Sequence, residues 1–201
     1  VFLIALVISN NFYVKNAGID FLNRFLEIDI FALFFICLCF LFVINGSNLI
    51  DGYNGLLSIH ALIILTNLFF VNYLGGNNNL AFLIFFIILI LAVFLKYNFP
   101  RAKLFLGDSG SYLLGTIIAI SAIKTSIANP LISPFYFCIL LFYLFFEVFF
   151  SFFRKLIFVR QSPLFPDSQH LHMSLYKLLV KKNGNKNHSN YSTSIYINVI
   201  Y

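Results

Sequence analysis

The chain has 201 residues, of which 61% are hydrophobic and only 10% are charged. A soluble domain is about half apolar and about a quarter charged, so this composition excludes a domain with a water-facing surface and indicates a polytopic membrane protein. The net charge of +6 does not indicate a nucleic-acid partner, because the Lys and Arg residues of membrane proteins gather in cytoplasmic loops.

Apolar runs and polar segments alternate along the chain. Residues 1–9 are interpreted as the tail of one span, and residues 10–29 as a loop with room for a short interfacial helix. Full spans, long enough with their flanks to cross about 30 Å of hydrocarbon, are expected around residues 30–44, 56–74, 80–95, 112–123 and 135–153. A last span is expected to begin at Tyr191.

These elements predict an all-α fold, a polytopic transmembrane helix bundle with cytoplasmic catalytic loops. We expect a single membrane domain over residues 1–201, with about five full spans and partial spans at both ends. Because apolar runs lie at both ends of the sequence, it is interpreted as a fragment of a longer multi-pass protein of the inner (plasma) membrane.

The basic residues determine the expected orientation. Most of them fall in polar segments on one side of the membrane, and only Lys15, Arg24 and Lys124 lie elsewhere. By the positive-inside rule, that side is the cytoplasm. Counting spans places the polar segments 45–55, 96–111 and 154–188 on this same side. Their convergence predicts a composite active site that faces the cytoplasm.

Residues 45–55, with the sequence NGSNLIDGYNG, interrupt an otherwise apolar pattern. Polar side chains recur there at every third position: Asn45, Asn48, Asp51 and Asn54. On a helix, the last three would share one face. A carboxylate and three amides at the end of a membrane helix are costly unless they face a cavity or a partner. The alternative is a simple loop between spans, where Asn, Asp and Gly are common turn residues.

Asp108, in the sequence LGDSGS, is expected at the start of an apolar helix. Asp at a helix N-terminus is first of all a cap. A carboxylate beside a Gly-rich turn can also hold Mg²⁺ and through it phosphate oxygens, and the helix end itself favours phosphate. Lys103 could neutralise that phosphate, and its alternative is an ordinary cytoplasmic lysine.

His170 and His172 lie in the sequence PDSQHLH. Side chains two positions apart share a face only in an extended segment, which the preceding prolines favour. Two imidazoles on one face could bind metal, donate to phosphate or transfer protons. An exposed loop with two histidines is the alternative, and a zinc site is a weak prediction because no third ligand stands at helical spacing.

Other polar residues carry weaker expectations. Glu147 lies inside an apolar span and is expected either to line a cavity or to pair with a polar group on a neighbouring helix. His60 is expected to serve helix packing, and His188 to be solvated. Residues 173–182 are amphipathic enough for a surface helix, and the lysines of residues 177–186 are expected to contact anionic headgroups of membrane lipids.

Taken in order, NGSNLIDGYNGL, NFPRAKLFLGDSGSYLLG and SPLFPDSQHLHM resemble motifs of the polyprenyl-phosphate N-acetylhexosamine-1-phosphate transferases, glycosyltransferase family 4. The resemblance covers about residues 30–177, and the PDxxHxH pattern is nearer to the GlcNAc-phosphate branch than to the phospho-MurNAc-pentapeptide branch. It implies transfer of a sugar-1-phosphate from a UDP-N-acetylhexosamine to undecaprenyl phosphate, with release of UMP and a requirement for Mg²⁺. Positioning and charge neutralisation supply most of the catalysis in such a phosphoryl transfer.

The resemblance also implies roles for single residues. Asp108 corresponds to a Mg²⁺-binding aspartate, and Asp51 to a catalytic carboxylate of the same metal site. His170 and His172 correspond to the HxH of a cytoplasmic loop, on the diphosphate or nucleotide side. The positions implied to bind substrate are Asn45, Asn48, Asn54, Asn98, Lys103 and Arg154, with Arg160 in the same basic segment as Arg154.

The sequence departs from the family pattern at two points. Many members carry a second aspartate where this chain has Asn54, and Asn there favours an enzyme of O-antigen or related surface-glycan synthesis. The family also has an Asp-Asp pair on an earlier cytoplasmic loop, whereas this chain contains no adjacent Asp pair. The pair is expected upstream of Val1, so the 201-residue chain alone is expected to be inactive.

Two other classes remain open from the sequence. A transporter or channel also gathers broken polar helices around a cavity, but it predicts polar residues near the middle of the bilayer and on both faces. The other is an inactive remnant. Because dimers occur in the family, a homodimer is also possible for this chain. The residues that select the sugar are expected to lie in the loop between Arg154 and His172.

Overall fold

The computed structural model describes residues 12, 14–159 and 169–201, and every regular element in this part of the chain is helical. The helices are α2 (Asp20–Leu26), α3 (Asp29–Ile50), α4 (Leu56–Leu74), α5 (Asn78–Asn98), α6 (Gly107–Ala128), α7 (Pro134–Leu140), α8 (Phe142–Phe153), α9 (Leu171–Asn183) and α10 (Lys186–Ile200). A π-helical segment, η1 (Arg154–Val159), continues α8. The all-α prediction is confirmed for these residues.

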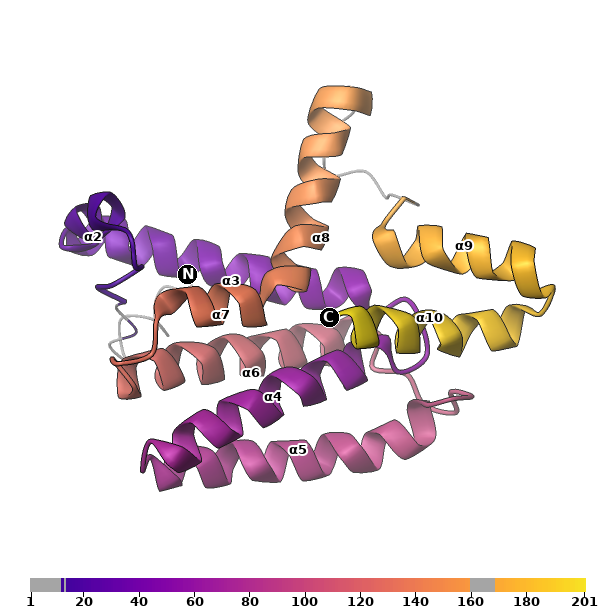
Figure 1. Ribbon diagram of the computed structural model, residues 1–201, viewed down its shortest axis with the longest axis horizontal. Coiled ribbons are helices and arrows are strands. Elements are labelled where there is room, and N and C mark those ends of the chain that lie inside the picture. The colour runs from indigo at the N-terminus through magenta and orange to yellow at the C-terminus, as the bar shows by residue number, and fades with distance from the viewer. Residues whose placement is uncertain (1–11, 13, 160–168) are drawn as a thin grey trace.

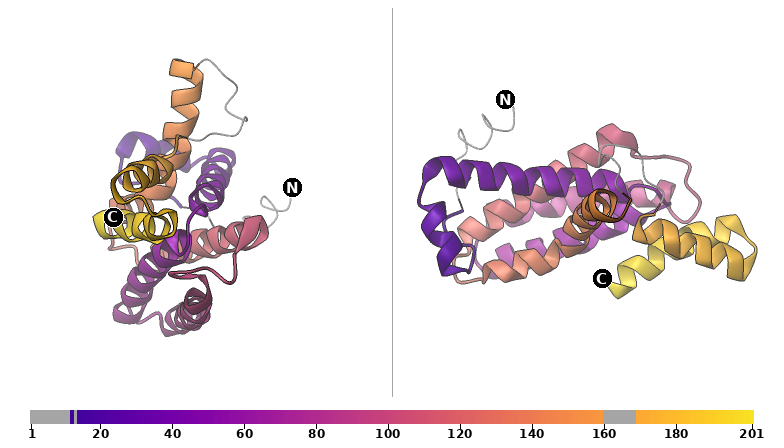
Figure 2. Two further views of the ribbon diagram at one scale, coloured as in Figure 1. Left: turned by 90° about the vertical axis from the view of Figure 1, so that its right-hand side faces the viewer. Right: turned by 90° about the horizontal axis from the view of Figure 1, so that it is seen from above.

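Helices α3 to α6 form the bundle. They contain 22, 19, 21 and 22 residues, which gives each a length of about 30 Å. Each is therefore long and apolar enough to cross a membrane. Helix α4 packs against α5 and α6, and α3 packs against α6 and α8. Figures 1 and 2 place α2 at one end of the bundle and the α9–α10 hairpin at the other.

The core lies where these helices meet. Phe40, Leu65, Ile118 and Leu144 are completely buried and come from α3, α4, α6 and α8. Helix α5, by contrast, turns large apolar side chains outward, among them Phe82, Phe86 and Ile90. Because hydrocarbon does not repel such side chains, packing at the helix crossings, rather than an apolar stripe, decides which faces meet.

Two glycines allow close helix crossings. A Cβ atom on Gly46 of α3 would lie 2.5 Å from the backbone oxygen of Leu144 in α8. A Cβ atom on Gly115 of α6 would lie 2.9 Å from the Cα atom of Ile44 in α3. Small residues at such positions let two backbones approach. Helix α3 is therefore fixed against α6 on one side and α8 on the other.

The predicted span over residues 135–153 is broken in the structure. Leu141 interrupts it with φ −109° and ψ 6°, and α7 and α8 are bent by 68° relative to each other. Figure 1 shows α8 rising away from the bundle. By length and composition the bent pair would count as a fifth crossing at most.

The C-terminal segment also differs from the prediction. Helix α10 begins at Lys186, not at Tyr191, and is not among the candidate spans of the described residues. Gly184, with φ 67°, ends α9, and the Asn185 side chain accepts a hydrogen bond from the His188 backbone N–H (3.0 Å) to start α10. Helix α10 then turns back onto α4, where it buries polar side chains: Ser189, Thr193, Ser194 and Asn198.

His60 joins α4 to α10, as its predicted packing role requires. Its Nδ1 atom lies 3.1 Å from the Asn198 Oδ1 atom, and the Asn198 amide donates to the Leu56 carbonyl oxygen (3.2 Å). The His60 ring also contacts Tyr143 and Tyr201. His188, in contrast, is exposed, as predicted. The α9–α10 hairpin is therefore anchored at the bundle end that holds the start of α4.

A polar cluster fixes the opposite end of α4. The buried Asn72 amide donates to Thr125 Oγ1 on α6 (2.7 Å), and the Asn129 amide donates to Asn72 Oδ1 (3.3 Å). Asn77, in the turn that follows α4, donates to Asn129 Oδ1 (3.2 Å). These contacts hold the α4–α5 turn against the end of α6.

Replacing Asn72 with Ala should lower the stability of the bundle without affecting the other end. It removes two interhelical hydrogen bonds, each worth about 0.6 kcal/mol and at most about 1.7 kcal/mol in membrane proteins. We expect a fall of about 1–3 kcal/mol, measured as a lower midpoint of thermal unfolding in detergent. Asn67→Ala is the matched control, because the exposed Asn67 amide donates to the Ile63 carbonyl oxygen of its own helix and to no other helix among the described residues. Equal midpoints for the two variants would contradict the role of this cluster.

Candidate active site

The polar segments of the sequence meet at the end of the bundle that carries the α9–α10 hairpin. The end of α3, the turn before α4, the segment after α5 and the start of α6 enclose a polar cavity of about 250 Å³. It is lined by Asn48, Asp51, Gly52, Tyr53, Asn54, Asn98, Phe105, Gly107 and Asp108. The predicted convergence of residues 45–55 and 96–111 is confirmed.

Asp108 lies in the first turn of α6, as the sequence predicts. The Asn48 amide donates to Asp108 Oδ1 (3.2 Å) and to Ser111 Oγ (3.0 Å), and the Ser111 hydroxyl donates to the Asp108 carbonyl oxygen (3.0 Å). The positive end of the helix dipole favours a carboxylate at this place. Asn48 therefore connects α3 to α6 and orients the Asp108 carboxylate at the cavity.

Asp51 enters the cavity from the end of α3. The helical face proposed for residues 48–54 is not continuous, because α3 ends at Ile50 and a turn follows. Gly55 closes this turn with φ 77°, and a Cβ atom there would lie 2.6 Å from the Phe99 ring. Burial, and secondly the Asp108 carboxylate, raise the pKa of Asp51 to about 6. The two carboxylates are thus electrostatically coupled although they lie far apart in the sequence.

Two asparagines of the cavity wall also hold its loops. Asn98 Oδ1 accepts from the Gly55 backbone N–H, and the Asn98 amide donates to the Leu104 carbonyl oxygen, both at 2.8 Å. The Asn54 amide donates to the Pro100 carbonyl oxygen (3.0 Å), and its backbone N–H donates to Asn190 Oδ1 (2.9 Å). These amides position the turn before α4 against the segment after α5.

Three predicted substrate-binding residues lie outside the cavity lining. The Asn45 amide donates to the Leu41 carbonyl oxygen of its own helix (2.7 Å). Lys103 is exposed. Arg154 follows α8, where its Nη1 atom donates to Gln169 Oε1 (2.9 Å) and its guanidinium lies over the Phe150 ring. Their predicted contacts with substrate stay predictions. Arg160 and most of the loop expected to choose the sugar lie outside the described residues.

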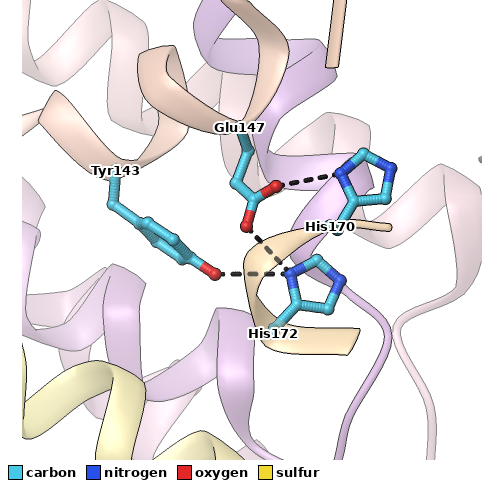
Figure 3. Close-up of polar contacts among 4 residues, drawn as sticks. All are labelled: Tyr143, Glu147, His170 and His172. Carbon is cyan, nitrogen blue, oxygen red and sulfur yellow. Dashed lines mark hydrogen bonds and ion pairs between the residues drawn. The ribbon is translucent and has the colours of Figure 1, made fainter. Parts of the chain in front are cut away.

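The histidines form a buried cluster with two residues of α8 (Figure 3). His170 Nδ1 lies 2.9 Å from Glu147 Oε2, and His172 Nδ1 lies 3.2 Å from Glu147 Oε1. The Tyr143 hydroxyl lies 3.3 Å from His172 Nδ1. The expectation of one extended segment is wrong beyond His170, because His172 lies inside α9. The two imidazole rings are nevertheless nearly parallel and contact the same carboxylate.

Glu147 and Tyr143 were not among the predicted site residues. The sequence offers a signal for both, since a carboxylate inside an apolar span needs a partner and residues four apart share a helix face. It offers no signal that the partners lie beyond the end of that helix. The cluster adjoins the cavity, because the Nε2 atom of His172 would lie 3.7 Å from a Cβ atom on Gly52, and the Tyr53 ring packs edge-on against His172.

The residues at the cavity fit a magnesium ion. Within residues 12, 14–159 and 169–201, no group of three or more His, Cys, Asp or Glu side chains is placed to hold a metal ion. Mg²⁺ does not need such a group, because it is usually bound through one or two carboxylates together with substrate phosphates. Asp51 and Asp108 supply two carboxylates at one cavity, and a bound cation would offset both the burial and, secondly, the Asp108 repulsion that raise the pKa of Asp51.

Residues 1–126 match the family described as Glycosyl transferase family 4. The chain belongs to this family. It is 34% identical over 152 residues to an undecaprenyl-phosphate alpha-N-acetylglucosaminyl 1-phosphate transferase of Thermotoga maritima, with 73% of this chain and 45% of the relative covered. It is 34% identical over 114 residues to a phospho-N-acetylmuramoyl-pentapeptide-transferase of Clostridium novyi, with 57% of this chain and 34% of the relative covered.

The chain is also 36% identical over 110 residues to a phospho-N-acetylmuramoyl-pentapeptide-transferase of Streptococcus pyogenes, with 53% of this chain and 33% of the relative covered. The chain thus spans less than half the length of these relatives. The family match includes both Asp51 and Asp108, whereas His170 and His172 lie beyond it. The resemblance inferred from the motifs is confirmed, and the chain is that of a multi-pass membrane protein.

Proposed function

We propose that this protein transfers a sugar-1-phosphate from a UDP-N-acetylhexosamine to undecaprenyl phosphate, with release of UMP. The observation that carries the proposal is the polar cavity, in which Asp51 and Asp108 from two separate family motifs face the same space. Membership of glycosyl transferase family 4 supports it. The lipid diphosphate product would serve cell-envelope glycan synthesis, and Asn54 favours O-antigen or a related surface polysaccharide.

The residues of the cavity suit a diphosphate. Asp51 and Asp108 would hold Mg²⁺, which when bound supplies neutralising charge for the phosphate oxygens. Asn48 keeps the Asp108 carboxylate oriented, and the N-terminus of α6 adds a partial positive charge. Phe105 is 74% exposed at the cavity and offers a ring face on which a nucleobase can stack.

We further propose that the cavity faces the cytoplasm, where UDP-sugars and the excess of basic residues are found. A transporter is less consistent with the distribution of polar groups. Glu147, the carboxylate inside an apolar span of the sequence, is paired with His170 and His172, and His172 lies beside Gly52 of the cavity lining. The ion-pair cluster and the cavity therefore belong to one site.

UMP release by the intact protein tests the proposal. In detergent with undecaprenyl phosphate and UDP-N-acetylglucosamine, we expect UMP release that requires both substrates and stops when EDTA removes Mg²⁺. UDP-N-acetylgalactosamine and UDP-glucose, run in parallel, define the sugar. Movement of UDP-sugar into proteoliposomes without UMP release would contradict the proposed transfer. We expect no release from the 201-residue chain on its own, and full release from it would contradict the expected upstream Asp-Asp pair.

A further inference from the structure

His172 has one occupied and one free ring nitrogen. The side chain is completely buried. Its Nδ1 atom contacts Glu147 and Tyr143, whereas its Nε2 atom is buried without a hydrogen-bond partner among the described residues. A buried polar atom without a partner is destabilising, because it has lost its hydrogen bonds to water. That cost points to a ligand atom at Nε2 when the site is occupied.

The free nitrogen lies next to the cavity lining. Gly52 lies beside it, and a Cβ atom on Gly52 would be 3.7 Å from Nε2. Gly52 is itself part of the cavity lining and follows Asp51 directly in the chain. A hydrogen bond from Nε2 into the cavity would therefore reach the same space that the two aspartates face.

Glu147 determines which ring nitrogen is available. A carboxylate accepts hydrogen bonds and does not donate them, so the hydrogen of His172 that faces Glu147 must be on Nδ1. The same holds for His170, whose Nδ1 atom contacts the other carboxylate oxygen. Figure 3 shows the carboxylate beside the edges of both rings, with one oxygen directed to each. The hydrogen bond on one imidazole nitrogen thus fixes the tautomer and orientation of the ring.

We propose that Glu147 is a positioning residue that holds His172 so that its Nε2 atom contacts a phosphate oxygen of the bound UDP-sugar. The inference rests on the proposed phosphoryl transfer. When the ring is charged, Nε2–H donates to the anionic oxygen and the Glu147 carboxylate balances the charge on the ring. Arg154 supports the arrangement, because its contact with Gln169 ties the end of α8 to the residue before His170.

Glu147→Gln tests the positioning role. Gln has nearly the same shape, but an NH2 group replaces one carboxylate oxygen and would face an Nδ1–H group as a second donor, so one ring must reorient or move its proton to Nε2. We expect kcat of UMP release to fall by on the order of 10²-fold, as for other groups that orient a functional histidine. KM for the UDP-sugar should change less than about 3-fold, because we expect the contact, weak in the bound UDP-sugar, to strengthen as negative charge develops in the transition state. Glu27→Gln is the matched control, because Glu27 is exposed beyond the other end of α3.

A double-mutant cycle separates positioning from general support of the fold. If Glu147 acts through His172, then Glu147→Gln should lower kcat by less than about 3-fold in a His172→Gln background. An undiminished, additive loss in that background would overturn the inference. So would a Glu147→Gln variant with wild-type kcat.

Nitrogen-15 NMR of histidine-labelled protein reads the tautomer without any substrate. The intact protein should show His172 protonated at Nδ1, with the signal assigned through His172→Gln, and Glu147→Gln should shift the ring toward Nε2 protonation. A wild-type ring protonated at Nε2 alone would overturn the positioning role. Absence of UMP release from the wild-type protein would instead contradict the proposed function, and the NMR result would still decide whether Glu147 fixes the ring.

Discussion

Replacing Asp108 with Asn is expected to lower Mg²⁺-dependent UMP release by on the order of 10³-fold or more, comparable to the loss of a group that stabilises transition-state charge. Asn keeps the size of the side chain, and its Oδ1 atom can still accept from the Asn48 amide. The local structure should therefore persist while the charge that faces the cavity is lost. Asp51→Asn should have an effect of similar size, because Asp51 supplies the second carboxylate of the same cavity.

The two aspartates should also depend on each other. If they hold one ion, the double variant should be little worse than either single variant, since groups that act as a unit are not additive. Asp29→Asn is the control, because Asp29 is an exposed residue in the first turn of α3, at the opposite end of that helix. UMP release from Asp108→Asn at the wild-type rate, with the same Mg²⁺ dependence, would rule out Asp108 as a metal ligand.

The sequence was sufficient to predict α3 to α6 and the meeting of residues 45–55 and 96–111 at one end of the bundle. Long apolar runs leave the backbone of a membrane protein few options besides helices, and the distribution of Lys and Arg places three polar segments on one side. That pattern correctly grouped Asp51 with Asp108, although 56 residues of sequence separate positions 51 and 108. The motif resemblance then supplied the family, which the comparison of residues 1–126 confirmed.

Side-chain partners were harder to predict, because they depend on helix ends and crossings. The three-residue spacing of Asn48, Asp51 and Asn54 suggested one helical face, but α3 ends at Ile50 and Asn54 instead donates to Pro100. Glu147 was expected either to line a cavity or to pair with a polar group on a neighbouring helix. Its histidine partners could not be found, because the 68° bend between α7 and α8 and the path of α9 are set by tertiary packing.

Replacing Gly46 with Val should have the largest effect on folding. The new Cβ atom would lie 2.5 Å from the Leu144 backbone oxygen and 3.0 Å from its Cα atom. A flexible side chain could move aside, but the backbone of α8 cannot move without displacing Tyr143 and Glu147, which it carries. Overpacking costs about 1–3 kcal/mol even where side chains can adjust. We therefore expect a greater loss, seen as little monodisperse protein in detergent and a lower unfolding midpoint.

A graded series distinguishes the crossing from a general effect of adding side-chain volume. Gly46→Ala should lower the unfolding midpoint less than Gly46→Val does. Gly115→Val should lower it about as much as Gly46→Val, because a Cβ atom on residue 115 would meet the backbone of α3. Ala92→Leu adds volume on the exposed side of α5 and should leave the midpoint unchanged. Any Gly46 variant that folds should lose UMP release in proportion to the displacement of α8, since Glu147 would leave the histidines. A Gly46→Val protein with the wild-type midpoint and activity would show that α8 does not depend on this crossing.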